Sequence, residues 1–427
     1  MMHYRLTREH LLYSSLLACI GAGACARASL GMMQPRLACS IEATDTPRAL
    51  VDTTKVRRIA RYVQAAEWNG RVVTVGTDLP FFTGKTASDS LLFAFADSAN
   101  LGSPAGTWRF AYPRIANSAV ASFVLVWGQT DSSSGPAIAL PVQRINSLWA
   151  SVYSATNGWS NATALFAANR IRWNPDGAAM VSARDGIATY GVAAVDEARV
   201  VDPHLVFFRR RDGIWMTREV AGTRGAIYSD VAVDETGRIA IAYVAPDWSV
   251  PKDGNSVFVV TSNDRGDTWN SPVLLSRSGG NRAAAPKILI GPDAAIHVLW
   301  RQSYAGGVPS DVIRHVNSED GAARWSAASD LSAAPGFLRF VAAIDACNIV
   351  HVAYEDWHGG GNEGDVDYAQ WHGAWTGPTH VLKGWLSIDP LLWIDAREQV
   401  HLFVLGRPVA ATMLGALANL EVMLKRR

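Results

Sequence analysis

The segment YEDWHGGGNEGDVDY, residues 354–368, gathers residue types that suit the binding or cleavage of a sugar. Carboxylates accept hydrogen bonds from sugar hydroxyls, and an indole stacks on the apolar face of a sugar ring. The glycine run in the middle lets the backbone approach a ligand closely. A solvated surface loop would have a similar composition, so both interpretations stay open. The candidate residues are Glu355, Asp356, Trp357, His358 and Tyr368.

The same segment offers oxygen ligands of the kind that Ca²⁺ prefers, on Asn362, Glu363, Asp365 and Asp367. Their spacing differs from that of an EF-hand loop. No cluster of His and Cys has the spacing of a zinc site, and no phosphate-binding glycine motif is present. The sequence therefore predicts neither a metal site nor a cofactor.

Three histidines, His297, His351 and His401, recur at equivalent places in similar apolar runs. Repetition of this kind favours a structural role over catalysis, because a reaction centre needs one such group rather than three. The nucleophile motif GxSxG and the metalloprotease motif HExxH are both absent. Serine hydrolase and zinc protease chemistry are therefore not predicted.

The elements that must position these side chains follow a repeat. Six tryptophans recur at intervals of 51, 56, 54, 56 and 50 residues, and each follows a β-rich run and a turn. Such regular spacing indicates a supersecondary unit of about 50 residues. The six are Trp108, Trp159, Trp215, Trp269, Trp325 and Trp375.

Each repeat predicts four strands, which we name A, B, C and D in chain order. The hairpin that ends near the tryptophan supplies C and D. Between these hairpins lie runs of small and β-branched residues, such as 231–247 and 288–302, which predict inner strands A and B buried on both faces. Repeated four-stranded units predict an all-β fold, a β-propeller.

Residues 57–427 accommodate seven such units, a count slightly preferred to six. Seven outer hairpins would require strands within 409–427. That tail is rich in helix-forming residues, which favours a helix instead. The expected organisation is a signal peptide at 1–26, a linker at 27–56 and a single propeller domain at 57–427.

Polar and aromatic side chains recur where strand B of each unit ends. Because equivalent strand ends of a propeller meet at one face, we expect these residues to lie on one surface. The outer hairpin turns would lie at the other face. Prominent residues at the expected B–C face are Asp78, Trp248, Arg301, Glu355, Asp356 and Arg407, and the D–A connections add Arg58, Arg282 and Arg339.

Composition excludes several classes of partner. The chain has 427 residues, with 39 Lys plus Arg and 38 Asp plus Glu, so its formal net charge is +1. This balance predicts no nucleic-acid binding. Hydrophobic residues make up 49% of the chain, which excludes intrinsic disorder.

The first residues resemble an export signal. Arg5 and Arg8 precede a short apolar run, and Ala24-Cys25-Ala26 fits a cleavage site. The run is too short for a transmembrane span. We therefore expect a secreted or periplasmic protein, with a lipid anchor at a cysteine as a variant. Beyond the signal only Cys39 and Cys347 remain, and they are compatible either with one disulfide or with two free thiols.

The octapeptide from Ser262 to Trp269 matches S-x-D-x-G-x-x-W at every position, through Ser262, Asp264, Gly266 and Trp269. It resembles the Asp box of sialidases and related BNR-repeat propellers. A diverged copy at 318–325 has its glycine shifted by one residue. Asp264 can cap the turn, Gly266 permits a positive φ, and Trp269 can fill the space between sheets. The box is therefore expected to be structural.

The sialidase resemblance implies three arginines that hold the carboxylate of the substrate, a tyrosine nucleophile assisted by a glutamate, and an aspartate acid. Arg58-Ile59-Ala60 resembles the R-I-P that opens the first strand in that family, although alanine replaces proline. The remaining roles follow only by position, because no motif identifies their residues. They fall on Arg301 and Arg407 as arginines, Asp78 as acid, and Glu355 with Tyr368 as the nucleophilic pair.

Two functions remain open from the sequence. The leading hypothesis is an exported propeller that binds or hydrolyses glycans at its B–C face, with exo-sialidase chemistry as the enzymatic form. The alternative is a non-catalytic scaffold that binds a protein or another cell-surface ligand. Convergent arginines and carboxylates at one surface would favour the glycan hypothesis.

Overall fold

The chain forms two compact units, Met1–Thr44 and Asp45–Arg427. All the residues that the computed structural model describes lie in the second unit. Every regular element among these residues is a β-strand, which confirms the predicted all-β class. The described residues are 48–52, 60–68, 71–78, 91–95, 110–119, 122–130, 145–154, 156–173, 178–182, 188–196, 202–249, 254–277, 282–304, 310–335, 339–357, 364–382, 385–394, 400–408 and 418–425.

Four of the sheets are four-stranded and antiparallel, as the repeat predicts. The first contains β14 (Tyr228–Val233), β15 (Ile239–Pro246), β16 (Asn255–Ser262) and β17 (Val273–Ser276). The second contains β18 (Arg282–Ile290), β19 (Ile296–Ser303), β20 (Ser310–Ser318) and β21 (Ser329–Pro335). The third contains β22 (Phe340–Ile344), β23 (Val350–Trp357), β24 (Gly364–Trp371) and β25 (Thr379–Leu382). The fourth contains β26 (Trp385–Ile394), β27 (Val400–Pro408), β28 (Ala418–Lys425) and β1 (Arg48–Asp52).

Two further sheets complete the described part of the chain. One is three-stranded and contains β2 (Ala60–Trp68), β3 (Arg71–Asp78) and β4 (Leu91–Phe95). The other has nine strands, because β9 pairs with both β7 and β11 and so joins two repeats. Its strands are β5 (Phe110–Ala119), β6 (Ser122–Thr130), β7 (Ile145–Ser154), β8 (Gly158–Trp159), β9 (Thr163–Arg172), β10 (Ala178–Ser182), β11 (Ala188–Asp196), β12 (His204–Arg211) and β13 (Ile214–Glu219).

The second strands β15, β19 and β23 are largely buried, as expected from their apolar runs. In β15, every residue from Ile239 to Ala245 is buried. An outer strand such as β13 is mostly exposed. Small and β-branched side chains fit this place because both faces of the inner strands pack against neighbouring sheets.

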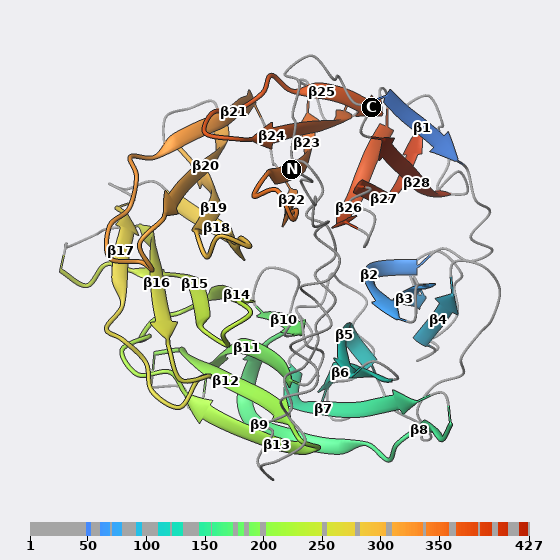
Figure 1. Cartoon of the computed structure of the whole chain (residues 1–427), viewed down its shortest axis with the longest axis vertical. Coiled ribbons are helices and arrows are strands. Elements are labelled where there is room, and N and C mark those ends of the chain that lie inside the picture. Colours follow the sequence, from blue (N-terminus) through green and yellow to red (C-terminus); the bar gives the residue numbers. More distant parts are fainter. Residues whose placement is uncertain are drawn as a thin grey trace, which may run out of the picture. The chain divides into compact units, whose positions relative to one another are not determined.

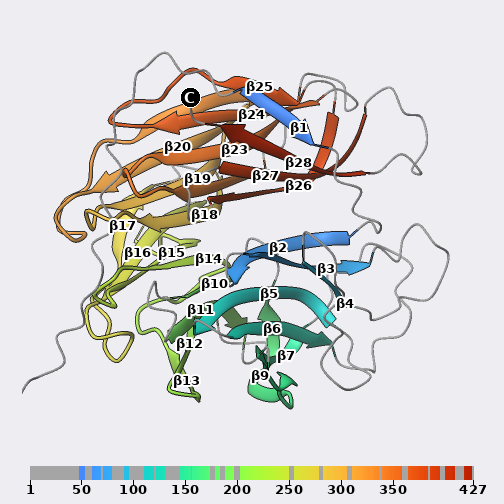
Figure 2. The ribbon, with the colours of Figure 1, turned by 45° about the vertical axis from the view of Figure 1, so that its right-hand side comes forward.

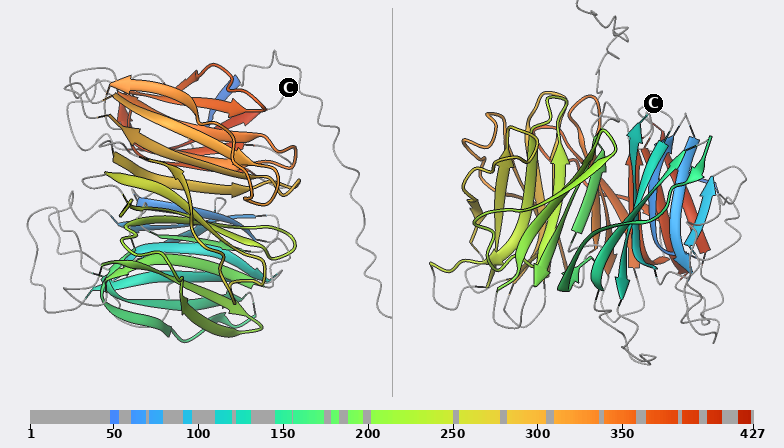
Figure 3. Two further views of the ribbon diagram at one scale, coloured as in Figure 1. Left: turned by 90° about the vertical axis from the view of Figure 1, so that its left-hand side faces the viewer. Right: turned by 90° about the horizontal axis from the view of Figure 1, so that it is seen from below.

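The sheets follow one another in chain order, with their first strands side by side (Figure 1). In succession, β2 lies beside β5, β5 beside β10, β10 beside β14, β14 beside β18, β18 beside β22 and β22 beside β26. Strand β26 in turn lies beside β2. The strands of neighbouring sheets run side by side across the unit (Figure 3). This arrangement is consistent with a propeller.

The C-terminal tail is a strand rather than the helix that its composition favours. Strand β28 pairs with β27 and, on its other side, with β1, which comes from the other end of the chain (Figure 2). In the register, Arg48 lies opposite Lys425 and Asp52 opposite Glu421. Helix propensity is overridden here because ladder hydrogen bonds on both sides satisfy the backbone of β28. Strand β1 falls within the range expected as linker.

The connections divide between two ends of each sheet. We call the end where the second strand stops and the third begins the B–C end. At the opposite end, the turn between β14 and β15 meets the turn between β16 and β17, because a Cβ on Gly237 would lie 2.7 Å from Nε of Arg265. The hairpin turns therefore share one end, as expected, and the polar strand termini share the other.

Candidate functional site

Two neighbouring sheets bring charged residues together at the B–C end. The β18–β21 and β22–β25 sheets share an apolar cluster that contains Leu299 and Ile313 from the first and Val352 and Tyr354 from the second. In a strand, residues two apart point to the same face. Charged residues that continue these rows toward the B–C end therefore lie on the two facing surfaces.

On the β18–β21 side, these residues are Arg301 and Asp311. Nε of Arg301 lies 3.8 Å from Oδ2 of Asp311, and the two side chains are only 14% and 6% exposed. Arg301 comes two residues after Leu299, and Asp311 comes two residues before Ile313. The predicted arginine is thus a nearly buried cation held beside a carboxylate.

On the β22–β25 side lies a group that we call the acidic cluster, Asp356, Asp365 and Asp367. Asp356 lies directly opposite Asp365, and Asp367 lies opposite Tyr354, so all three share the face that packs against the β18–β21 sheet. His380 from β25 places Nδ1 2.6 Å from Oδ1 of Asp367 and 3.6 Å from Oδ2 of Asp365. His380 is the counter-ion of this cluster when it is protonated.

Within the acidic cluster, Asp367 has a raised pKa. Burial raises the pKa of Asp367, although the hydrogen bond from His380 opposes the shift. The charges of Asp356 and Asp365 raise the pKa of Asp367 further. Like charges placed directly opposite in a sheet are destabilising, so the arrangement weakens the fold locally. Such groups can exchange protons with a ligand and accept hydrogen bonds from its hydroxyls.

Glu355 belongs to the opposite surface of the same sheet. Its backbone N–H donates to the carbonyl of Arg339 at 3.0 Å, so the two residues are cross-strand neighbours that share a face. That face, which includes Ala353 and Tyr368, packs against β26 and β27 through residues such as Leu402. The neighbouring candidates Glu355 and Asp356 therefore do not converge, because successive residues of a strand alternate in direction.

Tyr368 points away from the B–C end. Its hydroxyl contacts Nδ1 of His351 and accepts a hydrogen bond from Nε2 of Gln370 at 3.0 Å. His351 lies four residues before Glu355, about 13 Å along an extended strand. Burial raises the pKa of Tyr368, whereas a nucleophile needs a lowered pKa or an adjacent base. The structure does not bring this hydroxyl to Glu355.

The buried network around His351 has a structural explanation. Nε2 of His351 lies 2.9 Å from Oδ2 of Asp345, and both side chains are fully buried. Oδ1 of Asp345 accepts hydrogen bonds from the backbone of Cys347 at 2.8 Å and of Ile349 at 2.9 Å. The imidazole therefore links the turn between β22 and β23 to the hydroxyl of Tyr368.

The other two repeated histidines are also buried. Nδ1 of His297 lies 3.1 Å from Nε2 of His315, and their rings stack. Burial lowers the pKa of His297 to about 4 and that of His315 to about 3. His401 packs against the ring of Trp393. These contacts favour the structural role expected from the repetition.

The turn from Ser262 to Trp269 forms a compact hydrogen-bonded loop between β16 and β17. The hydroxyl of Ser262 donates to Oδ1 of Asp264 at 2.8 Å and accepts from the N–H of Gly266 at 2.8 Å. The N–H of Thr268 donates to Oδ1 of Asp264 at 2.8 Å. Hydrogen bonds from Thr268 and Ser262 lower the pKa of Asp264 to about 2. The carboxylate is therefore committed to the turn.

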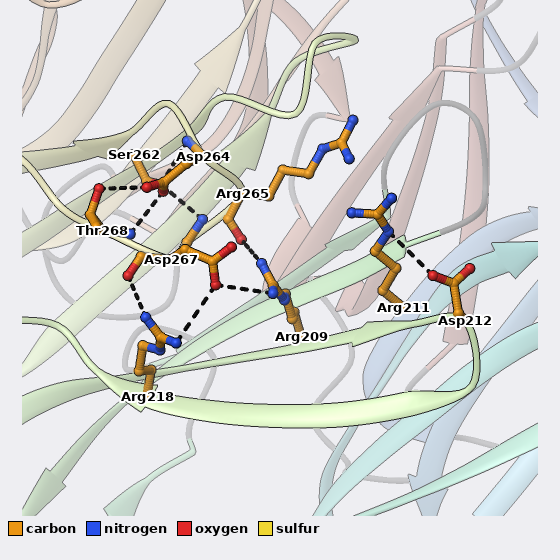
Figure 4. A network of polar contacts seen from close by, with 10 residues as sticks. Arg209, Arg211, Asp212, Arg218, Ser262, Asp264, Arg265, Asp267 and Thr268 are labelled. Carbon is orange, nitrogen blue, oxygen red and sulfur yellow. Dashed lines mark hydrogen bonds and ion pairs between the residues drawn. The ribbon is translucent and has the colours of Figure 1, made fainter.

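This turn also fastens the β14–β17 sheet to the preceding strands β12 and β13 (Figure 4). Arg209 donates to the carbonyl of Arg265 at 2.6 Å and to Oδ1 of Asp267 at 3.1 Å. Arg218 donates to the carbonyl of Asp267. Trp269 packs edge-on against Phe207, with ring centroids 5.2 Å apart. Every contact supports a structural role at the end opposite the candidate site.

The diverged copy folds in the same way. Ser318 donates to Oδ1 of Asp320 at 3.0 Å and accepts from the N–H of Ala322 at 2.9 Å. Both turns contain two successive residues with positive φ, Arg265 (63°) with Gly266 (87°), and Gly321 (74°) with Ala322 (77°). In the first turn the glycine is the second of these two residues, and in the diverged copy it is the first.

The remaining predicted residues are placed only in part. Arg58 and His358 lie outside the described residues. Asp78 ends β3, Trp357 ends β23 and Arg407 belongs to β27, each at the B–C end of its strand, and only their backbones are described. Sequence reasoning missed Asp311 and His380. Asp311 could have been found as a charged residue at the start of a third strand, whereas His380 lies on an outer strand and carries no such signal.

Two searches of the described residues concern metals and membranes. The described residues contain no group of three or more His, Cys, Asp or Glu arranged to hold a metal ion. They also contain no helix that is long and apolar enough to cross a membrane.

Comparisons with known proteins show a shared fold. No protein-family model matches the chain, and no curated protein matches it. Among solved structures, an ulvan lyase of a polysaccharide lyase family aligns with a TM-score of 0.55 and 10% identity, over 87% of this chain and 95% of its own. A protein of unknown function from Dyadobacter fermentans aligns with a TM-score of 0.50 and 13% identity, over 76% and 96%. The NanB sialidase of Streptococcus pneumoniae aligns with a TM-score of 0.44 and 10% identity, over 74% and 68%. The chain is therefore similar in its all-β fold to the ulvan lyase and to the Dyadobacter protein.

Proposed function

We propose that the protein is an exported β-propeller that binds glycans at its B–C end and acts on them there. One observation carries this proposal: the pair Arg301–Asp311 and the acidic cluster lie on facing surfaces of two adjacent sheets at the same end. A guanidinium donates a planar fork of hydrogen bonds, and carboxylates accept bonds from hydroxyls. Sugars present both kinds of partner in a small space.

The propeller that supports this site has seven blades in our proposal. The support is the succession of neighbouring first strands from β2 to β26, together with the return of β26 to β2. Pairing of β1 with β28 supplies the fourth strand of the last blade from the other end of the chain. Such a closure would cover the outer edge of β28 with a strand from the other end of the chain. The two turns with the S-x-D pattern would then be Asp boxes in consecutive blades.

The comparison with the ulvan lyase supports the class of ligand. That protein is a polysaccharide lyase and has been solved with -[GlcA(1-4)Rha3S]- bound. At 10% identity its residues cannot be transferred, so the analogy concerns only what such a fold can hold. The site itself must be tested on the residues of this chain.

Export is part of the proposal and rests on the basic and apolar start of the chain, residues 1–26, which lie outside the described residues. A lipid anchor at Cys19 or Cys25 is the variant. Mass spectrometry of the mature N-terminus in a host that secretes the protein distinguishes free, lipidated and uncleaved forms. An intact Met1 in all of the recovered protein would contradict export through cleavage.

The function is tested by binding and turnover of a glycan panel that contains sialosides, polyuronates and neutral oligosaccharides. Arg301→Lys keeps the charge but loses the planar fork, and Asp356→Asn keeps the shape of the side chain but loses its charge. We expect each variant to weaken binding of the preferred glycan at least tenfold. Arg211→Ala is the matched control, because Arg211 pairs with Asp212 in a hairpin turn at the opposite end.

The scaffold hypothesis makes the opposite prediction. A protein-binding scaffold would bind none of the glycans, and its stability alone would change in the two variants. Binding that persists unchanged in both variants would mean that the glycan site lies elsewhere on the propeller.

A further inference from the structure

Trp248 is an exposed indole at the B–C end of the β14–β17 sheet. It lies two residues after the end of β15, and 58% of its surface is accessible. Among the described residues, the other large exposed apolar side chains are Ile214 and Val273. Ile214 begins β13 beside a hairpin turn at the opposite end, and Val273 begins an outer strand. Trp248 thus differs from both in its size and in its place beside the strand ends that carry the candidate site.

The indole contacts the connection that leads into β14. Its Nε1 lies 3.5 Å from the carbonyl oxygen of Arg224, in the connection that leads into β14. Gly225 has a φ of 82°, and a Cβ there would lie 2.9 Å from Pro246 and 3.2 Å from the ring of Trp248. Glycine therefore lets the ring lie directly against the backbone. An indole that already lies against the backbone loses less entropy than a free one when a ligand stacks on it.

One exposed guanidinium group lies over the ring, and a second pairs with the residue that precedes it. The guanidinium carbon of Arg224 lies 4.9 Å from the ring centroid of Trp248, and Nε of Arg224 lies 2.6 Å from Oδ2 of Asp202. Nε of Arg277 lies 3.4 Å from Oδ2 of Asp247, the residue before Trp248. The side chains of Arg224 and Arg277 are 71% and 62% exposed. Both make these carboxylate contacts through Nε, so the Nη groups are the part of each fork that can meet an anion.

The surroundings favour a sugar over a protein partner. A protein interface has an apolar core of several residues, in which aromatic side chains are enriched. Here the residues around Trp248 are charged, and among the side chains whose burial is described no second large exposed apolar one lies at this end. A sugar ring needs only one aromatic platform and polar groups at its edge. Two exposed arginines favour a sugar that carries a carboxylate or a sulfate.

We propose that Trp248, Arg224 and Arg277 form a rim subsite for an anionic sugar residue of a polymer that also reaches Arg301 and the acidic cluster. The face of the indole that Arg224 does not cover stacks on the ring of the sugar, and the guanidinium groups bind its anionic substituent. The inference rests on the proposed glycan function and adds the charge class of the ligand and a second point of contact.

Isothermal titration calorimetry on the full chain tests the proposal with four probes: octagalacturonate, its methyl ester, dextran sulfate and dextran. We expect wild-type protein to bind one or both anionic probes at least tenfold more tightly than the neutral counterpart. Preference for octagalacturonate would identify a carboxylate as the bound group, and preference for dextran sulfate would identify a sulfate. Trp248→Ala should weaken that binding about tenfold, and Arg224→Gln should reduce its dependence on salt. Ile214→Ala is the control for loss of an exposed apolar side chain.

The outcomes separate the two proposals. Anionic binding that is unchanged in Trp248→Ala but lost in Arg301→Lys would overturn the rim subsite and leave the glycan function in place. Equal affinity for the acid and its methyl ester, and for dextran sulfate and dextran, would overturn the anionic class. Failure of the wild-type protein to bind any of these probes or any member of the glycan panel would overturn both proposals.

Discussion

Gly266→Ala should be a severe test of how the S-x-D turn holds two sheets together. The backbone of Gly266 has a φ of 87°, where an L residue costs about 1 kcal/mol. An added Cβ would lie 2.3 Å from Cε1 and 2.7 Å from Cζ of Phe207. Phe207 is fully buried between Tyr190 and Trp269, so its ring has little room to move. Overpacking of this kind costs about 1–3 kcal/mol, for a total of about 2–4 kcal/mol.

A second glycine isolates the backbone part of this cost. Gly373 has a φ of 73°, and a Cβ there would meet nothing within 4 Å. Gly373→Ala should therefore cost about 1 kcal/mol. For a chain of this length, 1 kcal/mol corresponds to about 1 °C in melting temperature, so the two variants should separate by about 1–3 °C in differential scanning calorimetry.

The steric explanation also predicts a rescue. Phe207→Leu removes the ring that the new Cβ would strike, so Gly266→Ala should cost less in that background than in the wild type. Ala322 occupies the equivalent place in the second turn with a φ of 77°, which shows that the backbone alone tolerates a Cβ there. Equal destabilisation by Gly266→Ala and Gly373→Ala, with no rescue, would refute the steric reasoning.

Three further predictions concern polar groups that the fold holds in hydrogen bonds or ring contacts. Tyr368→Phe removes the hydroxyl bound by His351 and Gln370, so it should lower the free energy of unfolding by about 1–2 kcal/mol and leave glycan binding unchanged. Calorimetry and an assay of sugar release measure the two effects. Loss of turnover with no change in stability would instead support Tyr368 as the nucleophile. The lowered pKa values of His297 and His315 mean that between pH 6.5 and about 4 the unfolded chain binds protons that the folded chain does not. The free energy of unfolding should therefore fall as pH falls through this window, by up to about 1.4 kcal/mol per pH unit for each imidazole. In urea unfolding measured at several pH values, His315→Phe should make this dependence on pH weaker. An unchanged dependence on pH would contradict the role given to the buried imidazoles. The pKa of Asp264 lies below its usual value, so the stabilisation from its carboxylate is present above pH 3.8 and is lost toward pH 2. Asp264→Asn should lower the melting temperature at pH 7 and reduce the decrease in melting temperature between pH 4 and pH 2. A decrease as large as in the wild type would contradict this role of Asp264.

The strand pattern could be predicted from the sequence because its signals are local. Evenly spaced tryptophans, alternating runs and turn residues predicted four strands per repeat, and the structure has four-stranded antiparallel sheets. The tail was the exception. Its helix-forming composition is a local signal, but β28 is held between β27 and β1, and β1 lies more than 350 residues away in the chain. No local pattern could reveal that partner.

The candidate site shows the same division. The sequence determined which residues stand at strand ends, since the repeat gives their positions, and it identified Arg301 and Asp356 there. Only the tertiary structure decided which face each residue occupies and which sheet it meets. Asp356 and Arg301 lie on the facing surfaces of two adjacent sheets, whereas Glu355 lies on the opposite face of its strand. The hydroxyl of Tyr368 contacts His351. The physical reason is that alternation along a strand is local, but the surface opposite each face is supplied by residues far away in sequence.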